Sequence, residues 1–102
     1  MNKKQPHKST THDERYIHIT NLWGSLKYKA ATIFARQENG EWFMAVALCW
    51  KVDQFCRATG RQNARRNYFK GNKQSLGITF EYDKAVARAF ERIAASEQGQ
   101  EH

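Results

Sequence analysis

The dipeptide Asn39-Gly40 constrains the fold of this chain more than any other feature. It lies between two runs rich in β-branched and aromatic residues, 26–37 and 42–50. Asn-Gly is the preferred centre of a type I′ turn, because both positions of that turn need a positive φ. A two-residue loop also sets the register, so we predict a long β-hairpin over residues 26–50. The predicted pairs are Gln37 with Trp42, Ala35 with Met44, Ile33 with Val46, and Ala31 with Leu48.

Both faces of this hairpin are apolar. The pairs above form an aliphatic face, and the run 42–50 has no polar side. A strand that is apolar on both faces is typical of the interior of a sheet rather than its edge. We therefore predict that residues 42–50 form an inner strand. The opposite face carries Ala30, Thr32 and Phe34 against Phe43, Ala45, Ala47 and Cys49.

Two more strands and two helices are predicted around the hairpin. Residues 16–20 and 76–82 alternate between apolar and polar side chains, as half-buried strands do. Asp53 and Asp83 are plausible N-caps for the two helices. The fold class is therefore α+β, a small antiparallel sheet of three or four strands with two helices packed on it, in the order β-β-β-α-β-α. The expected inner residues of the last strand are Leu76, Ile78, Phe80 and Tyr82; those of the first helix are Val52, Phe55, Cys56 and Thr59.

Gly60 lies inside the first predicted helix. It either ends that helix or marks a place where a continuous helix passes close to the sheet. We favour one helix that continues to Gly71-Asn72. The domain prediction is a flexible basic arm over 1–14, a single α+β domain over 15–95 and a flexible tail over 96–102.

Composition argues against several classes of protein. No apolar run approaches the length of a transmembrane span, and the basic N-terminus has no apolar segment of a secretory signal, so we expect a cytoplasmic protein. Cys49 and Cys56 are expected to be reduced and largely buried, and no zinc spacing is present. The histidines are expected to be solvated, and we predict neither a metal nor a cofactor. They are His7, His12, His18 and His102.

The acidic side chains are scattered, and none is paired with a nucleophile or a base in a recognisable catalytic arrangement. Helix capping is enough to explain Asp53 and Asp83. No glycine-rich phosphate loop is present either. We therefore do not expect an enzyme.

Positive charge is concentrated in residues 51–73, which hold seven Lys or Arg residues and one acid, Asp53. This segment supplies +6 of the formal net charge of +7. Arg57, Arg61 and Arg65 are spaced at i, i+4 and i+8, so a helix places them on one face. Like charges stacked in this way are mildly unfavourable, which indicates an anionic partner.

Nucleic acid fits this pattern best, with largely sequence-independent contacts to the phosphate backbone. Asparagine and glutamine side chains could hydrogen-bond the backbone or base edges, and Tyr68 could stack on a base. Of the two adjacent aromatic residues, Phe69 is the one we expect in the core. The pattern does not distinguish DNA from RNA or indicate an oligomeric state. The predicted binding residues are Arg57, Arg61, Gln62, Asn63, Arg65, Arg66, Asn67, Tyr68, Lys70 and Lys73.

The segment 53–66 reads D-x-F-x-R-x-x-G-R-x-x-A-x-R and follows a β-hairpin. In this it resembles short, uncharacterised proteins of phages and other mobile elements. The resemblance covers about 35 residues and implies a mobile-element context but no mechanism. The matching residues are Asp53, Phe55, Arg57, Gly60, Arg61, Ala64 and Arg66.

That context raises a second class of function, a small phage- or plasmid-type protein that binds and modulates a host protein. Tryptophan is enriched in the hot spots of protein interfaces, so Trp23, Trp42 and Trp50 are the residues of interest for this alternative. Packing within the sheet and loops would explain the same three residues without any partner.

Overall fold

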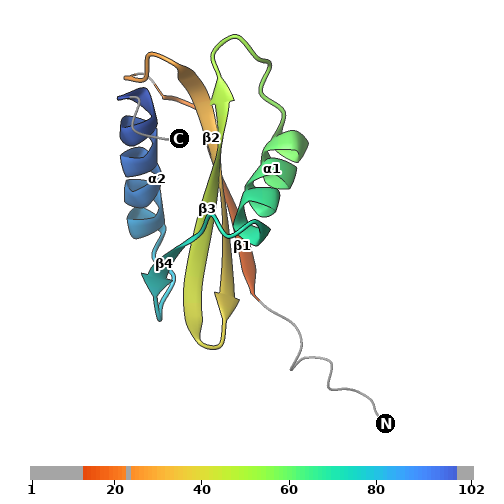
Figure 1. Cartoon of the computed structure of the whole chain (residues 1–102), viewed down its shortest axis with the longest axis vertical. Coiled ribbons are helices and arrows are strands. Elements are labelled where there is room, and N and C mark those ends of the chain that lie inside the picture. Colours follow the sequence, from red (N-terminus) through yellow and green to blue (C-terminus); the bar gives the residue numbers. More distant parts are fainter. Residues whose placement is uncertain (1–12, 23, 99–102) are drawn as a thin grey trace.

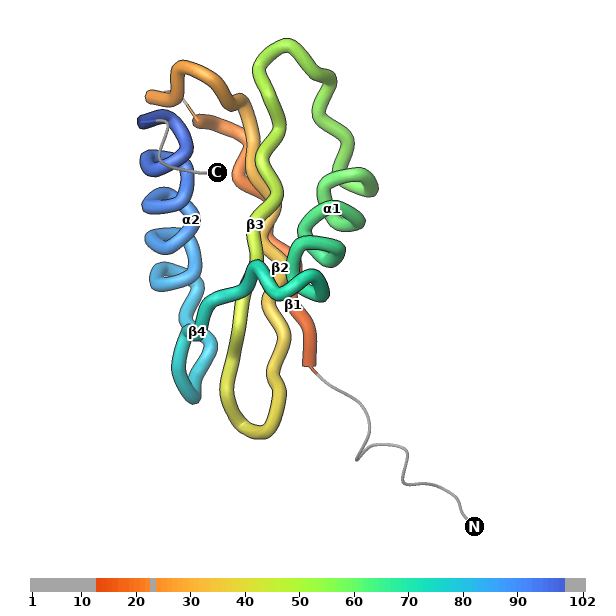
Figure 2. The backbone as a smooth tube through the Cα atoms, in the orientation of Figure 1, coloured from red at the N-terminus to blue at the C-terminus, as the bar shows by residue number. Residues whose placement is uncertain are grey.

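The computed structural model describes residues 13–22 and 24–98. All neighbouring strands of its one sheet are antiparallel, in the spatial order β1-β2-β3-β4. The sheet lies between the two helices, so that each helix covers one face (Figures 1 and 2). The predicted α+β fold and its order of elements are confirmed. The elements are β1 (Glu14–Ile19), β2 (Tyr28–Glu38), β3 (Glu41–Trp50), α1 (Arg57–Phe69), β4 (Gln74–Gly77) and α2 (Tyr82–Glu97).

The hairpin of β2 and β3 is as predicted. Asn39 and Gly40 have φ angles of 53° and 82°, the positive values that a type I′ turn needs. The four predicted residue pairs are all present in the observed register. β3 is an inner strand, but β4 pairs only with its residues 42–44.

The two faces of the sheet form two separate cores. The face toward α2 is the larger one and includes Ile33, Met44 and Leu76, all at most 1% exposed. The face toward α1 is built around Phe34, which is fully buried against Ala64 and Tyr68 of the helix. Because successive side chains of β2 point to opposite faces, this strand contributes residues to both cores.

Helix α1 begins later than predicted. Cys56, not Asp53, is its N-cap, because residues 51–56 form the turn and extended segment that carry the chain from β3 onto the sheet face. The predicted buried stripe is therefore wrong: Val52 is 92% exposed, Cys56 and Thr59 are exposed, and Phe55 is half-buried.

The seam between α1 and the sheet consists of Gly60, Ala64 and Tyr68 instead, spaced at i, i+4 and i+8. The helix is continuous through Gly60. A Cβ atom on Gly60 would overlap the hydroxyl of Thr32 in β2 and lie 3.2 Å from its Cβ. Glycine is therefore present because the helix backbone rests directly on the sheet.

Strand β4 is shorter than the predicted strand 76–82. Gly77, the last residue of β4, has a φ of 96°, which turns the chain out of the sheet at that point. Ile78 is consequently 79% exposed, and Tyr82 is already the first residue of α2. The N-cap of α2 is Glu81, so that Asp83 lies in the first turn rather than at the cap.

The domain also extends past both predicted boundaries. Glu14 already belongs to β1, and α2 continues to Glu97. Ser96 is buried and shares a hydrogen bond with the Tyr28 hydroxyl. The Glu97 carboxylate accepts hydrogen bonds from Ser25 and from the Leu26 amide, and the Ser25 bond is the main reason that the pKa of Glu97 is lowered.

The remaining residues of the predicted arm and tail, 1–12 and 99–102, lie outside the described part of the chain. Neither α1 nor α2, the two helices that the structure describes, is long and apolar enough to cross a membrane.

Candidate nucleic-acid interface

The arginines of α1 flank its buried seam. Arg57, Arg61 and Arg65 follow the helical register of Gly60 and Ala64 by one residue, which is a rotation of about 100°. They therefore do not lie opposite the buried face, as predicted, but along its side next to β1. The pKa of His18 in β1 is lowered by its burial and, to a smaller extent, by the nearby charges of Arg57 and Arg61.

Arg65 is held in place by β1. Its guanidinium forms an ion pair with Glu14 at 3.0 Å and reaches the Tyr16 hydroxyl at 3.5 Å. It also lies 5.2 Å from the ring centroids of both Phe34 and Phe69. The hydrogen bonds with Tyr16 and Glu14 raise the pKa of Arg65. Its charge is thus partly neutralised within the protein.

A second acid, Glu38, neutralises part of the charge just beyond the C-terminus of α1. Lys73 lies 3.7 Å from the Glu38 carboxylate and 4.8 Å from the ring centroid of Tyr68. The Tyr68 hydroxyl donates a hydrogen bond to the same carboxylate. Burial and this acceptor raise the pKa of Tyr68 far above its usual range.

Four of the six predicted phosphate-binding cations remain available. Within residues 13–22 and 24–98, Arg57, Arg61 and Lys70 form no salt bridge, and all three are exposed. Arg66 is exposed and donates a hydrogen bond to the neutral side chain of Asn63 at 2.9 Å. These four cations, Arg57, Arg61, Arg66 and Lys70, are called the open cations below.

The roles predicted for Tyr68 and Phe69 are exchanged. Tyr68 is 1% exposed, because it continues the seam of Gly60 and Ala64, and it has no free ring face to offer a base. Phe69 is 56% exposed and is the aromatic side chain presented at the end of the arginine row. The expectation that Phe69 is the core residue was wrong.

The three predicted hydrogen-bonding residues are not equally available. Asn67 donates to the carbonyl of Val46 at 2.9 Å, on the part of β3 that β4 does not cover. Asn63 is half-buried and bonded to Arg66. Only Gln62 is exposed without such a contact among the described residues, so little base reading is expected from this face.

His18 is a residue of this interface that sequence reasoning missed. It is half-buried, its Nδ1 lies 2.9 Å from the Thr32 hydroxyl, and its ring packs edge-on against Phe55. Burial, followed by the charges of Arg57 and Arg61, lowers its pKa. The alternation of β1 already put Tyr16 and His18 on one face, but nothing in the sequence placed that face next to α1.

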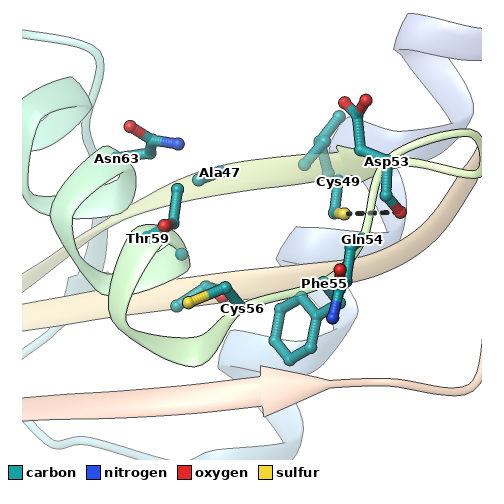
Figure 3. Close-up of a pocket in the computed structure, with 11 residues that line it drawn as sticks. Ala47, Cys49, Asp53, Gln54, Phe55, Cys56, Thr59 and Asn63 are labelled. Atoms are coloured by element: carbon teal, nitrogen blue, oxygen red, sulfur yellow. Dashed lines mark hydrogen bonds between the residues drawn. The ribbon is translucent and has the colours of Figure 1, made fainter.

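A small pocket of about 140 Å³ lies beneath the start of α1 (Figure 3). It contains both cysteines, which are free thiols. Cys49 is half-buried, and burial raises its pKa, whereas Cys56 is exposed, contrary to expectation. Hydrogen bonds from the first turn of the helix, chiefly Thr59, lower the pKa of Cys56.

The described residues contain no group of three side chains that could hold a metal ion. Trp42 is buried at 5% exposure, which its packing in the sheet explains, while Trp50 is 49% exposed. Trp23, like His7, His12 and His102, lies outside the described residues.

No family model, curated protein or solved structure matches this chain. The relation to mobile-element proteins therefore stays a prediction. Two positions of the pattern behind that resemblance, Gly60 and Ala64, have a structural role here, because both permit the close approach of α1 to the sheet.

Proposed function

We propose that this protein binds nucleic acid through the exposed surface of α1, mainly by contacts with the phosphate backbone. The observation that supports the proposal is the set of open cations. Four positive side chains lie within one 13-residue helix and its C-cap, and none of them has an ion pair in the described part of the chain. Like charges grouped in this way are mildly unfavourable unless an anion binds them.

Two nearby acids neutralise some cations of this segment and, among the described residues, leave others unpaired. Glu14 pairs with Arg65 of α1, and Glu38 pairs with Lys73 in the segment between α1 and β4, so both pairs join this part of the chain to the sheet. Binding and anchoring are thus carried out by different cations of the same segment. The open cations are free to meet phosphates without loosening the fold.

The number of open cations gives the expected salt dependence. Release of counterions by four phosphate contacts gives a slope of log affinity against log salt of about −3.6 for a duplex and about −2.8 for a single strand. Affinity should then fall by roughly two decades between about 50 and 200 mM salt. Fluorescence anisotropy with labelled oligonucleotides at several salt concentrations measures this slope.

The decisive variant is Arg57→Gln combined with Arg61→Gln. It removes two open cations, so the slope should decrease by about 1.4 to 1.8. A matched control is Lys84→Gln with Arg88→Gln on α2, which removes the same charge from the helix on the opposite face of the sheet. The control should keep the slope of the parent. Equal slopes for parent and both variants, or no binding even at low salt, would refute the proposal.

The second candidate function, binding to a host protein, is favoured by one apolar cluster. Leu26, Trp50 and Val52 are 84%, 49% and 92% exposed. They lie at the same end of the sheet, where the Lys51 amide donates to the Lys27 carbonyl at 2.8 Å. Three exposed apolar residues at one end resemble the anchors of a protein interface.

A pull-down from bacterial lysate, with and without nuclease, separates the two candidates. Loss of every partner on nuclease treatment supports nucleic acid. A stoichiometric protein that survives nuclease and moderate salt, and that is lost with Trp50→Ser and Val52→Ser, supports the second candidate.

A further inference from the structure

Phe69 is an exposed aromatic ring in a strongly basic surface. It follows Arg65 by four residues, so it continues the row of Arg57, Arg61 and Arg65 along α1. More than half of the residue is exposed, at 56%. Single exposed apolar residues are common on protein surfaces, so exposure alone indicates nothing. What distinguishes Phe69 is that its ring lies between the arginines of a basic surface.

The ring of Phe69 is nevertheless held in a defined position. Its centroid lies 5.0 Å from that of Tyr68 and 6.3 Å from that of Phe34, two rings of the core. Arg36 and Arg65 approach it at 5.3 and 5.2 Å from the centroid. An ordered ring loses little conformational freedom when a flat ligand stacks on it.

A second aromatic side chain extends this surface onto β1. Tyr16 is 37% exposed, packs on Phe34 at 5.0 Å and is joined to Arg65 through its hydroxyl. Tyr16, Arg65 and Phe69 therefore form one connected surface, with Phe34 fully buried underneath. Aromatic rings and guanidinium planes are the groups on which unpaired bases stack.

We propose that the nucleic acid bound by α1 is single-stranded, with one base stacked on Phe69 and the phosphates on the open cations. The inference rests on the proposed function and names its ligand. The bases of a duplex are stacked on one another and cannot reach a ring on the protein surface. A single strand can use the cations and the ring together.

The test compares a labelled oligothymidylate with a duplex of the same length, using the parent protein and Phe69→Leu. Leucine keeps an apolar side chain but removes the stacking face. The loss of single-strand affinity should be about 5- to 150-fold. The salt slope should not change, because stacking releases no counterions, so the two plots of log affinity against log salt should be parallel.

Phe90→Leu is the matched control. Phe90 is a comparably exposed phenylalanine, at 46%, on the helix that covers the other face of the sheet. Its substitution should leave both affinities unchanged. Circular dichroism confirms that each variant is folded before binding is measured.

The outcomes distinguish failure of the single-strand inference from failure of phosphate binding. Duplex bound as tightly as the single strand, or a Phe69→Leu variant that binds like the parent, overturns the single-strand inference and leaves phosphate binding intact. The predicted decrease of the salt slope in the Arg57 and Arg61 variant supports phosphate binding independently of Phe69. Absence of binding to either oligonucleotide at low salt overturns both.

Discussion

Replacement of Gly60 by alanine should destabilise this protein, although it improves the intrinsic helix propensity of α1. Glycine costs about 1 kcal/mol relative to alanine in a helix interior, so propensity alone predicts a gain of that size. The new methyl group, however, would overlap the Thr32 hydroxyl. Thr32 is 1% exposed, is β-branched and lies in β2, which is paired on both sides, so its position is difficult to change.

The size of the effect follows from the contacts. Forcing an extra methyl group into a packed site costs about 1–3 kcal/mol. Rotation of the Thr32 side chain away from the methyl group would break its 2.9 Å hydrogen bond with His18, which costs about 1 kcal/mol more. After the gain in propensity is subtracted, Gly60→Ala should lower the free energy of unfolding by about 1–3 kcal/mol. Chemical denaturation followed by far-ultraviolet circular dichroism measures it.

A double-mutant cycle tests the cause. In a Thr32→Ala background the overlapping hydroxyl is gone, so Gly60→Ala should become neutral or stabilise by up to about 1 kcal/mol. Gln62, two residues further along α1 and exposed, serves as the control. The difference between Gln62→Gly and Gln62→Ala gives the propensity contribution of this helix without any packing.

The opposite result would refute the reasoning. If Gly60→Ala stabilises the parent protein by the same amount as Gln62→Ala stabilises relative to Gln62→Gly, the helix does not rest on Thr32. The close approach of α1 to the sheet, and with it the position of the arginine row beside β1, would then be wrong.

Two further predictions concern the same side of the sheet. The folded state lowers the pKa of His18 below its usual value of 6.5, so the unfolded chain binds more protons as the pH falls through about 6.5 and the stability of the protein decreases there. His18→Asn should flatten this dependence between about pH 7 and pH 5 in thermal melts, and an unchanged slope would contradict it. Tyr68→Phe removes the hydrogen bond to Glu38 and should cost about 1.5 kcal/mol in chemical denaturation, the lower end for a charged acceptor, since Glu38 is partly exposed. A variant as stable as the parent would show that this bond contributes nothing.

The sequence was most informative where local geometry decides the structure. The Asn39-Gly40 turn determines the register of β2 and β3 on its own, and the observed pairs follow from it. The possible close approach at Gly60 was also visible, because a glycine inside a helix is unfavourable unless packing or function requires it.

Prediction failed where the path of the chain, rather than the local pattern, sets the outcome. The alternation of residues 76–82 is that of a strand, yet β4 ends at Gly77, where φ is positive. The N-cap of α1 is Cys56 rather than Asp53, because the chain first has to cross from β3 to the sheet face. The buried face of α1 therefore differs from the predicted one. As a result Tyr68 is a core residue and Phe69 is exposed, the reverse of the prediction.

The positive charge of the candidate site was predictable from the sequence. Which of its cations form ion pairs within the protein was not. Seven cations in residues 51–73 indicate an anionic partner from composition alone. Which of them are neutralised depends on Glu14 and Glu38, residues of β1 and β2 that are distant in the sequence. No spacing rule connects Glu14 with Arg65, so the open cations could be identified only from the fold.

The hydrogen bonds that tie Glu97 to Ser25 and Leu26 have a consequence for synthesis of the protein. They join residues about 70 positions apart, so they raise the contact order of the fold. They can form only after nearly the whole chain has been synthesised. The hairpin and α1 leave the ribosome well before α2 does. During that interval the face of the sheet that carries Ile33 and Met44 has no helix to cover it. The nascent chain thus exposes its larger core to the cell until residue 97 has emerged, and during that time it is most open to aggregation and to chaperones.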